Sequence, residues 1–221
     1  MTDVTLRTSS RSGDRTPEEE ARSLRERLRA GTLEARWLEL GAHLSYAPAA
    51  LALGPESEGP SEAGAWLLGF ARFGREVALR AALGLARALA PHAPPEACLP
   101  KLLPLLETWL LPMGRRRGRL ARLSQGELRI QIGLAAQTAL SAGLAERTAV
   151  ANRTGEVGAG GLSAIAASRA GRLALAEDDA EAQSSLQDCA AAAAVLLSDE
   201  EVREAVRFEL LPWTLIQLAR E

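Results

Sequence analysis

The sequence predicts an all-α protein, and three features lead to that prediction. Alanine and leucine, which favour helices, take the place of aromatic residues, which make up only 4% of the 221 residues. Ser/Thr-x-x-Glu motifs begin at Thr16, Ser124 and Ser198, each before an apolar segment, and this motif is typical of a helix N-terminus. Strand-like alternation is confined to residues 128–132, within a segment that is otherwise helical. We therefore expect an irregular multi-helix bundle or a short α-solenoid.

The centre of this fold is expected to be one continuous helix over residues 61–89. Ser61 is its predicted N-cap. Apolar side chains cover most of its circumference, and a helix of this kind is normally buried on most sides. The remaining side carries a polar stripe, in which Glu76 and Arg80 are four residues apart and are expected to form an ion pair. The other helices should therefore pack around this buried central helix.

The domain organisation is predicted from composition. Residues 1–15 are polar and aperiodic and are expected to form a mobile tail. The rest, residues 16–221, is expected to form a single all-helical domain, and the basic segment within 112–124 is where it would subdivide. Two similar segments start 43 residues apart, at Ala65 and Thr108, a spacing found in α-solenoids. Chance similarity between leucine-rich helices is the simpler explanation.

Caps and helix breakers place the other helices. Thr16 and Pro17 predict the start of the first helix, and Gly31 predicts its end. Pro100 and Pro104 predict a late start or a kink in the segment that contains them. The expected helices cover residues 17 to about 30, a short segment after Thr32, 48–53, 96 to about 111, 125 to about 151, about 162–176, about 178–197, and 199 to near the C-terminus with a kink at Pro212. The glycine-rich segment 152–161 is expected to be a flexible loop, and Trp66 and Trp213 are expected in the core.

Two segments resemble known helical proteins. The terminal motif consists of Val202, Arg203, Ala205, Val206, Arg207, Glu209, Leu210, Pro212 and Trp213. With the Trp-Leu-Leu segment near residue 109 and the alanine-rich helices between, it resembles uncharacterised, alanine-rich helical proteins of high-GC bacteria, of myxobacterial and planctomycete type. That resemblance implies a helical fold and a bacterial source, and it implies no site. Residues 38–54 resemble a single Sel1-type helical repeat, which implies a style of packing.

The sequence contains no combination of residues typical of an active site or a metal centre. It has no phosphate-binding loop and no Gly-x-Ser-x-Gly motif. His43 and His92 have no Cys or His at metal-ligand spacing. Cys98 and Cys189 each lie among apolar residues, as expected of buried, reduced thiols. We therefore expect a protein that is not an enzyme and that carries no cofactor and no metal.

One local charge cluster stands out. Five arginines fall within eight residues: Arg115, Arg116, Arg117, Arg119 and Arg122. The structural interpretation is a solvated link whose charges complement the C-terminus of the preceding helix. The functional interpretation is an anion-binding surface. No aromatic residues are interleaved with the arginines to stack on bases, so an acidic protein partner is preferred to nucleic acid.

These observations lead to two functional hypotheses. The first is a non-enzymatic helical protein–protein interaction module, such as an adaptor, a regulator or an immunity-type inhibitor. The alternative is a helical domain that binds a small molecule or a lipid. No uncharged segment reaches about 18 residues, so no membrane span is expected. The N-terminus lacks a secretory signal pattern, so a cytoplasmic location is expected. The oligomeric state is left open.

Overall fold

The computed structural model describes residues 16–54, 60–111, 118–154 and 158–220. Over these ranges it contains ten α-helices, short 3₁₀ helices and no strand, which confirms the predicted fold class. None of the described helices has both the length and the apolar character needed to cross a bilayer. The helices are α1 (Pro17–Arg29), α2 (Ala35–His43), α3 (Ala47–Leu53), α4 (Ala63–Leu68), η2 (Gly69–Phe73), α5 (Arg75–Leu89), η3 (Ala90–His92), η4 (Pro95–Ala97), α6 (Leu99–Leu110), η6 (Arg119–Arg122), α7 (Gln125–Thr154), α8 (Ala159–Leu175), α9 (Asp179–Leu196) and α10 (Asp199–Ala219). The predicted mobile tail, residues 1–15, lies outside the described ranges.

The chain divides into two compact units. The smaller unit comprises the residues up to Gly59 together with Thr214–Glu221, and the larger unit comprises Pro60–Trp213. α10 contributes residues to both, because the division falls within it. Residues 112–124, where the sequence favours a subdivision, belong to the larger unit.

The smaller unit has a hydrophobic core of its own, built from α1, α2, α3 and the last turns of α10. The buried core residues are Leu24, Leu33, Leu38, Ala42, Ala49 and Leu218. Arg27 of α1 donates hydrogen bonds to the carbonyl oxygens of Leu218 and Arg220, which have no helical partner at the end of α10. Tyr46 donates a hydrogen bond of 2.6 Å to a carboxylate oxygen of Glu20. The end of α10 is therefore an integral part of this unit.

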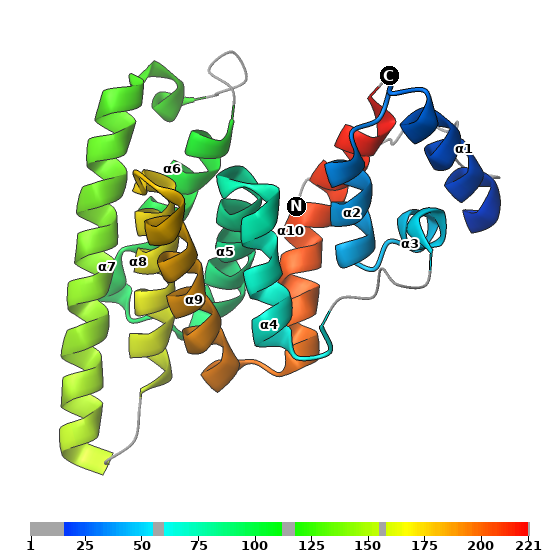
Figure 1. Ribbon diagram of the computed structural model, residues 1–221. Helices are drawn as coiled ribbons and strands as arrows, with labels where there is room; N and C mark the ends of the chain where they lie inside the picture. Colours follow the sequence, from blue (N-terminus) through cyan, green and yellow to red (C-terminus); the bar gives the residue numbers. More distant parts are fainter. Residues whose placement is uncertain (1–15, 55–59, 112–117, 155–157, 221) are drawn as a thin grey trace, which may run out of the picture. The chain divides into compact units, whose positions relative to one another are not determined.

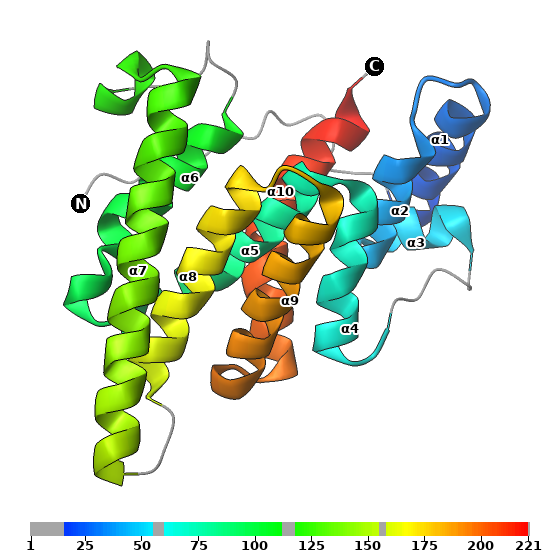
Figure 2. The same ribbon diagram turned by 60° about the vertical axis from the view of Figure 1, so that its left-hand side comes forward.

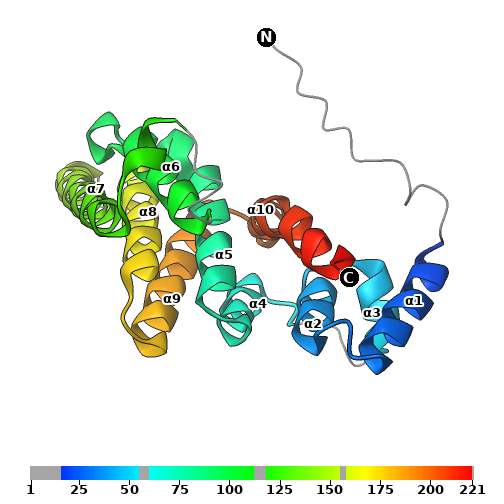
Figure 3. The same ribbon diagram turned by 90° about the horizontal axis from the view of Figure 1, so that it is seen from above.

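In the larger unit α5 is the central helix. Ten of its fifteen residues are buried, as predicted for a helix surrounded by others. It packs against α6, α8 and α9. Figures 1 and 2 show α7, α8 and α9 in successive positions, with α7 at the edge of the unit, and Figure 3, in which α7 is seen nearly end-on, shows the same order.

The stretch 61–89 is not one continuous helix, so that prediction is wrong. α4 ends at Leu68, a 3₁₀ segment follows, and α5 begins only at Arg75. Between them Gly74 has φ of +98°, a conformation that glycine adopts without steric cost. Ser61 is not the N-cap, because α4 begins after Glu62 without a side-chain capping bond. The helical spacing of apolar residues does not show the break, because α4 and η2 bury their aromatic side chains just as α5 buries its apolar ones.

The predicted capping boxes are confirmed at all three helix starts. Thr16 and Glu19 exchange side-chain-to-backbone hydrogen bonds at the start of α1. The backbone N–H of Ser124 donates to Glu127 at 2.8 Å, and that of Ser198 donates to Glu201 at 2.8 Å. The predicted Glu76–Arg80 ion pair is also present, at 2.9 Å. These features depend only on residues three or four positions apart, which explains why the sequence predicts them.

The loop in the glycine-rich segment 152–161 is shorter than predicted. α7 continues to Thr154 and α8 begins at Ala159, so Gly161 lies within a helix. A Cβ added to Gly161 would lie 2.8 Å from the carbonyl oxygen of Gly143 on α7. The two backbones are therefore in close contact at this crossing, and the glycine there has a role in packing.

The two tryptophans expected in the core differ in burial. Trp66 is 1% exposed and packs edge-to-face on Phe70, with ring centroids 4.8 Å apart. Trp213 is only half-buried, and the Arg80 guanidinium lies 4.6 Å from its ring centroid. The core assignment is therefore confirmed for Trp66, while Trp213 lies at the margin, partly covered by a charged side chain.

Candidate functional site: a groove between α5 and α10

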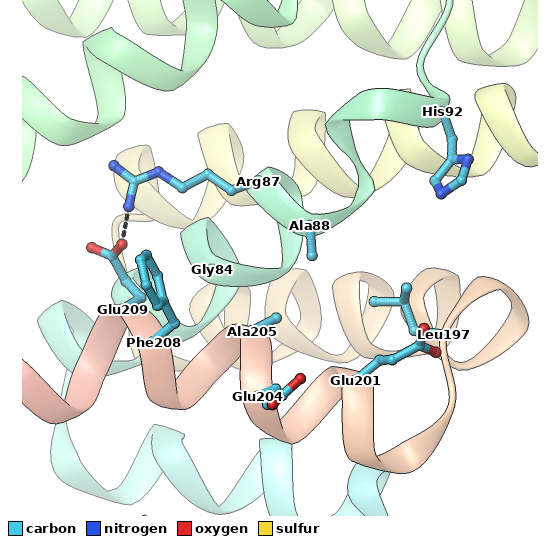
Figure 4. Close-up of a pocket in the computed structure, with 10 residues that line it drawn as sticks. All are labelled: Gly84, Arg87, Ala88, His92, Leu197, Glu201, Glu204, Ala205, Phe208 and Glu209. Carbon is cyan, nitrogen blue, oxygen red and sulfur yellow. Dashed lines mark hydrogen bonds and ion pairs between the residues drawn. The ribbon is translucent and has the colours of Figure 1, made fainter. Parts of the chain in front are cut away.

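A groove of about 690 Å³ lies between α5 and α10 within the larger unit. Its residues come from the end of α5, from η3 and from the first half of α10, with one residue after α9 (Figure 4). They are Gly84, Arg87, Ala88, His92, Leu197, Glu201, Glu204, Ala205, Phe208 and Glu209. All of them belong to Pro60–Trp213, so the groove is formed by one compact unit.

Small residues let the two helices approach each other at the floor of the groove. A Cβ added to Gly84 would lie 2.7 Å from the carbonyl oxygen of Ala205, closer than non-bonded atoms come. The two helix backbones therefore touch at this point. Figure 4 places Ala88 and Ala205 beside the crossing, with Phe208 and Glu209 on one side and His92 and Leu197 on the other.

The only arginine that lines the groove is held by carboxylates. Arg87 donates to Glu209 through one nitrogen and to Glu107 through another, the latter at 2.6 Å. Glu209 also lies 4.0 Å from Arg80, and its side chain is only 12% exposed. This network neutralises Arg87 and fixes the register of α10 on α5, because several charged partners hold one another in place.

Two further glutamates give the groove an acidic wall. One carboxylate oxygen of Glu201 accepts hydrogen bonds from the backbone and hydroxyl of Ser198, each at 2.8 Å. These bonds lower the pKa of the Glu201 carboxyl from its ordinary value, so it is negative at neutral pH. Glu204, one turn further along α10, is exposed and forms no ion pair with any residue in the described ranges. The groove therefore has an excess of negative charge.

The most exposed large apolar side chain of the groove is Phe208, at 83%. It lies on the same wall as Glu204, one turn away on α10. His92 is exposed at the opposite end of the groove. An exposed aromatic ring beside carboxylates is a surface suited to an apolar group that carries a positive charge.

The terminal motif quoted above holds α10 in place. Arg203 donates to the carbonyl oxygens of Pro60 and Ser61 at 2.9 and 2.6 Å, and its guanidinium lies 4.9 Å from the centroid of the Trp66 ring. Glu209 pairs with Arg80 and Arg87 as described. These residues therefore orient the helix, and the groove side chains lie between them in the sequence.

The arginine cluster predicted as a partner site falls largely outside the described ranges. Arg115, Arg116 and Arg117 are not described, and Arg119 is described only as part of the η6 backbone. Arg122 is exposed at the end of η6. The cluster therefore stays a prediction, and Arg122, the one member whose side chain is described, is not among the residues that line the groove.

The other candidate residues are the two histidines and the two cysteines. His43 is buried in the smaller unit, whereas His92 lies at the groove in the larger one. Both cysteines are free thiols; Cys189 is buried and Cys98 is half-buried. Among the described residues, no three His, Cys, Asp or Glu side chains are grouped so that they could hold a metal ion.

Sequence reasoning missed Phe208, Glu204 and the groove itself. Phe208 is one of several apolar residues of the last helix, and nothing in the local pattern separates an exposed aromatic residue from a buried one.

Comparison of this chain with protein-family models, curated proteins and solved structures finds no match.

Proposed function

We propose that this protein is a non-enzymatic helical interaction module whose α5–α10 groove binds a short apolar segment of a partner protein carrying a lysine or arginine. The exposure of Phe208, 83%, carries this proposal. An aromatic side chain in this position offers a large apolar contact that water covers in the free chain, and aromatic residues commonly supply the central contacts of protein interfaces.

Charge selects the kind of partner segment. Arg87 is already paired with two glutamates, so it has little capacity to attract an anion. Glu204 has no ion-pair partner in the described ranges, and Glu201 uses one of its oxygens in the helix cap. A cationic group on the bound segment would therefore compensate the excess negative charge beside the ring. For the arginine cluster, in contrast, the functional interpretation is an acidic protein partner.

A displayed peptide library selected against the whole chain tests this proposal. The enriched peptides should combine apolar residues with Lys or Arg. Their binding should weaken at least about tenfold in Phe208→Ala, because loss of an aromatic anchor at an interface costs over 1.4 kcal/mol. Glu204→Gln should slow association and reduce its dependence on salt.

Matched controls lie close by. Val195 is 63% exposed on α9, Glu200 lies in the first turn of α10, and neither is among the residues that line the groove. Val195→Ala and Glu200→Gln should leave peptide binding unchanged. Equal affinity of the enriched peptides for wild type and Phe208→Ala would refute the groove as the binding site.

The volume of the groove supports a second candidate function, binding of a small molecule. About 690 Å³ lies within the range of about 300–1,000 Å³ that is usual for ligand pockets. The exposed His92, Glu204 and Phe208 leave one side open, which favours a peptide over an enclosed ligand. Native mass spectrometry of the freshly purified chain distinguishes the two, since a retained small molecule would favour the second candidate.

A further inference from the structure

The outer face of α7 is an uncharged helical surface that the other described helices of the larger unit leave uncovered. α7 spans Gln125–Thr154, and its buried side packs against α6, η4 and α8. On that side Leu128, Ile132, Ala136 and Ala139 are at most 3% exposed. Figure 3 shows α8 on one side of α7 and none of the described helices of the unit on the other.

The outer face is apolar as well. Ile130 is 64% exposed, Leu134 66% and Leu144 49%. Helical spacing places these three residues on one stripe with Gln137 and Ser141. No charged residue occurs in 130–145, a run of sixteen residues in the middle of a surface helix. A helix apolar on both faces is normally buried on both faces, so this stripe is expected to be covered.

Two threonine hydroxyls at this face are satisfied within the helix. The hydroxyl of Thr138 donates to the carbonyl oxygen of Leu134 at 2.9 Å, and that of Thr148 donates to the carbonyl oxygen of Leu144 at 2.9 Å. Burying these threonines would therefore leave neither of their hydroxyls without a partner. Gln137 and Ser141 also lie on the stripe, and their side chains would need partners in the interface.

We propose that this face is the interface of an antiparallel homodimer, with a second copy of this chain as its occupant. A neutral face excludes a partner chosen by charge, and the stripe is nearly symmetric about Gln137. Ile130 and Leu144 lie seven residues to either side of Gln137. A two-fold axis at Gln137 therefore places Ile130 of each copy against Leu144 of the other, which gives two equivalent contacts. At the axis the two Gln137 amides face each other, and each amide carries both a donor and an acceptor.

The area of this face limits the dimer to weak affinity. With the two-fold axis at Gln137 the two α7 helices overlap over residues 125–149, about 37 Å, and a contact stripe about 10 Å wide covers roughly 750 Å² over two copies. Stable interfaces bury at least about 1,200 Å², so a weak dimer that forms at high protein concentration is expected. Because no charge lies within the stripe, raising the salt concentration should not weaken the dimer.

Sedimentation equilibrium of the full chain tests the proposal directly. Wild type should dimerise, and Leu134→Glu should weaken dimerisation at least about tenfold, because it places a charge in a neutral interface. Val195→Glu is the matched control, since Val195 is 63% exposed on α9 and should leave the dimer intact. A monomer at every accessible concentration, or equal dimerisation of wild type and Leu134→Glu, would overturn the proposal.

Disulfide trapping is a second test, which does not depend on whether Leu134→Glu folds. In a Cys98→Ser background, Gln137→Cys should form a covalent dimer under mild oxidation, because two copies of this position meet at the axis. Thr148→Cys should not, because its two copies would lie about 33 Å apart along the paired helices. A covalent dimer from Thr148→Cys and none from Gln137→Cys would show that this antiparallel register is wrong.

Discussion

Cys189 shows how one buried residue couples the stability of the fold to pH. Its side chain is fully buried between α8 and α9, and the thiol donates to the carbonyl oxygen of Ala166 at 3.2 Å. Burial raises the pKa of the Cys189 thiol to about 12, and the nearby Asp188 adds to that effect. The native state therefore keeps this proton at a pH where an unfolded chain, with an ordinary cysteine pKa of about 9, has lost it.

The sign of the effect follows from proton linkage. Above the unfolded pKa the unfolded state binds fewer protons than the native state, so the free energy of unfolding falls as pH rises. We expect this contribution to be complete below about pH 9 and to be lost progressively between about pH 9 and about pH 12. Denaturant titrations of the wild type at neutral and alkaline pH should show the loss, and Cys189→Ser should show less of it.

The control for this prediction is Cys98→Ser, which should keep the full alkaline loss of the wild type. Tyr46 should cause part of the alkaline loss of stability in every variant, because burial and the hydrogen bond to Glu20 raise its pKa as burial raises that of Cys189. An identical alkaline loss in Cys189→Ser and wild type would show that the Cys189 thiol titrates normally in the folded protein.

At the scale of helices, a single glycine sets the distance between α5 and α10. The backbone of α10 reaches Gly84 so closely that an added Cβ would meet the Ala205 carbonyl oxygen at 2.7 Å. We expect Gly84→Ala to push the helices apart and to lower the free energy of unfolding by about 1–3 kcal/mol, the usual cost of overpacking. Thermal denaturation measures the effect, and binding to the α5–α10 groove should change with it.

Gly126, in the first turn of α7, has free space where Gly84 has none. An added Cβ there meets nothing within 4 Å. Gly126→Ala should therefore stabilise the protein by up to about 1 kcal/mol, since alanine loses less backbone freedom in a helix. If Gly84→Ala stabilised the protein as Gly126→Ala does, the close approach of α5 and α10 would not exist.

The sequence predicts those features of the helices that depend on residues close together in the chain. The starts at Thr16, Ser124 and Ser198 are predicted because a capping box involves residues only three positions apart. The break at Gly74 is not predicted, because glycine is compatible with a helix and with a left-handed turn, and the apolar spacing continues on both sides of it.

The groove could not be predicted because it depends on pairing between distant segments. Gly84 and Ala205 are more than a hundred positions apart, and only the fold brings them into contact. The exposure of Phe208 depends on which face of α10 turns toward α5, and that orientation is set by Arg203 and Glu209 through their partners on other elements. Neither the contact between Gly84 and Ala205 nor the orientation of α10 can be recognised from the spacing of neighbouring residues.

At the scale of the whole molecule, α10 provides residues to two separate cores. The smaller unit has few buried side chains besides those of α1–α3, and Leu218 near the end of α10 is one of them, at 4% exposure. Units of this size bury little apolar surface per residue, so each core residue makes a large contribution to their stability. The smaller unit is therefore expected to depend strongly on the last turns of α10.

Hydrogen exchange tests this dependence with two neighbouring residues of the same helical turn. Leu218→Ala should cost the smaller unit at least about 2 kcal/mol, the lower end for a buried leucine, and so speed amide exchange in α1–α3 by at least about 30-fold. Ile216 is 55% exposed, and Ile216→Ala should leave exchange there nearly unchanged. Amides of α5 and α8, in the core of the larger unit, should stay protected in both variants. If Leu218→Ala left α1–α3 as protected as in wild type, the end of α10 would not belong to the core of the smaller unit.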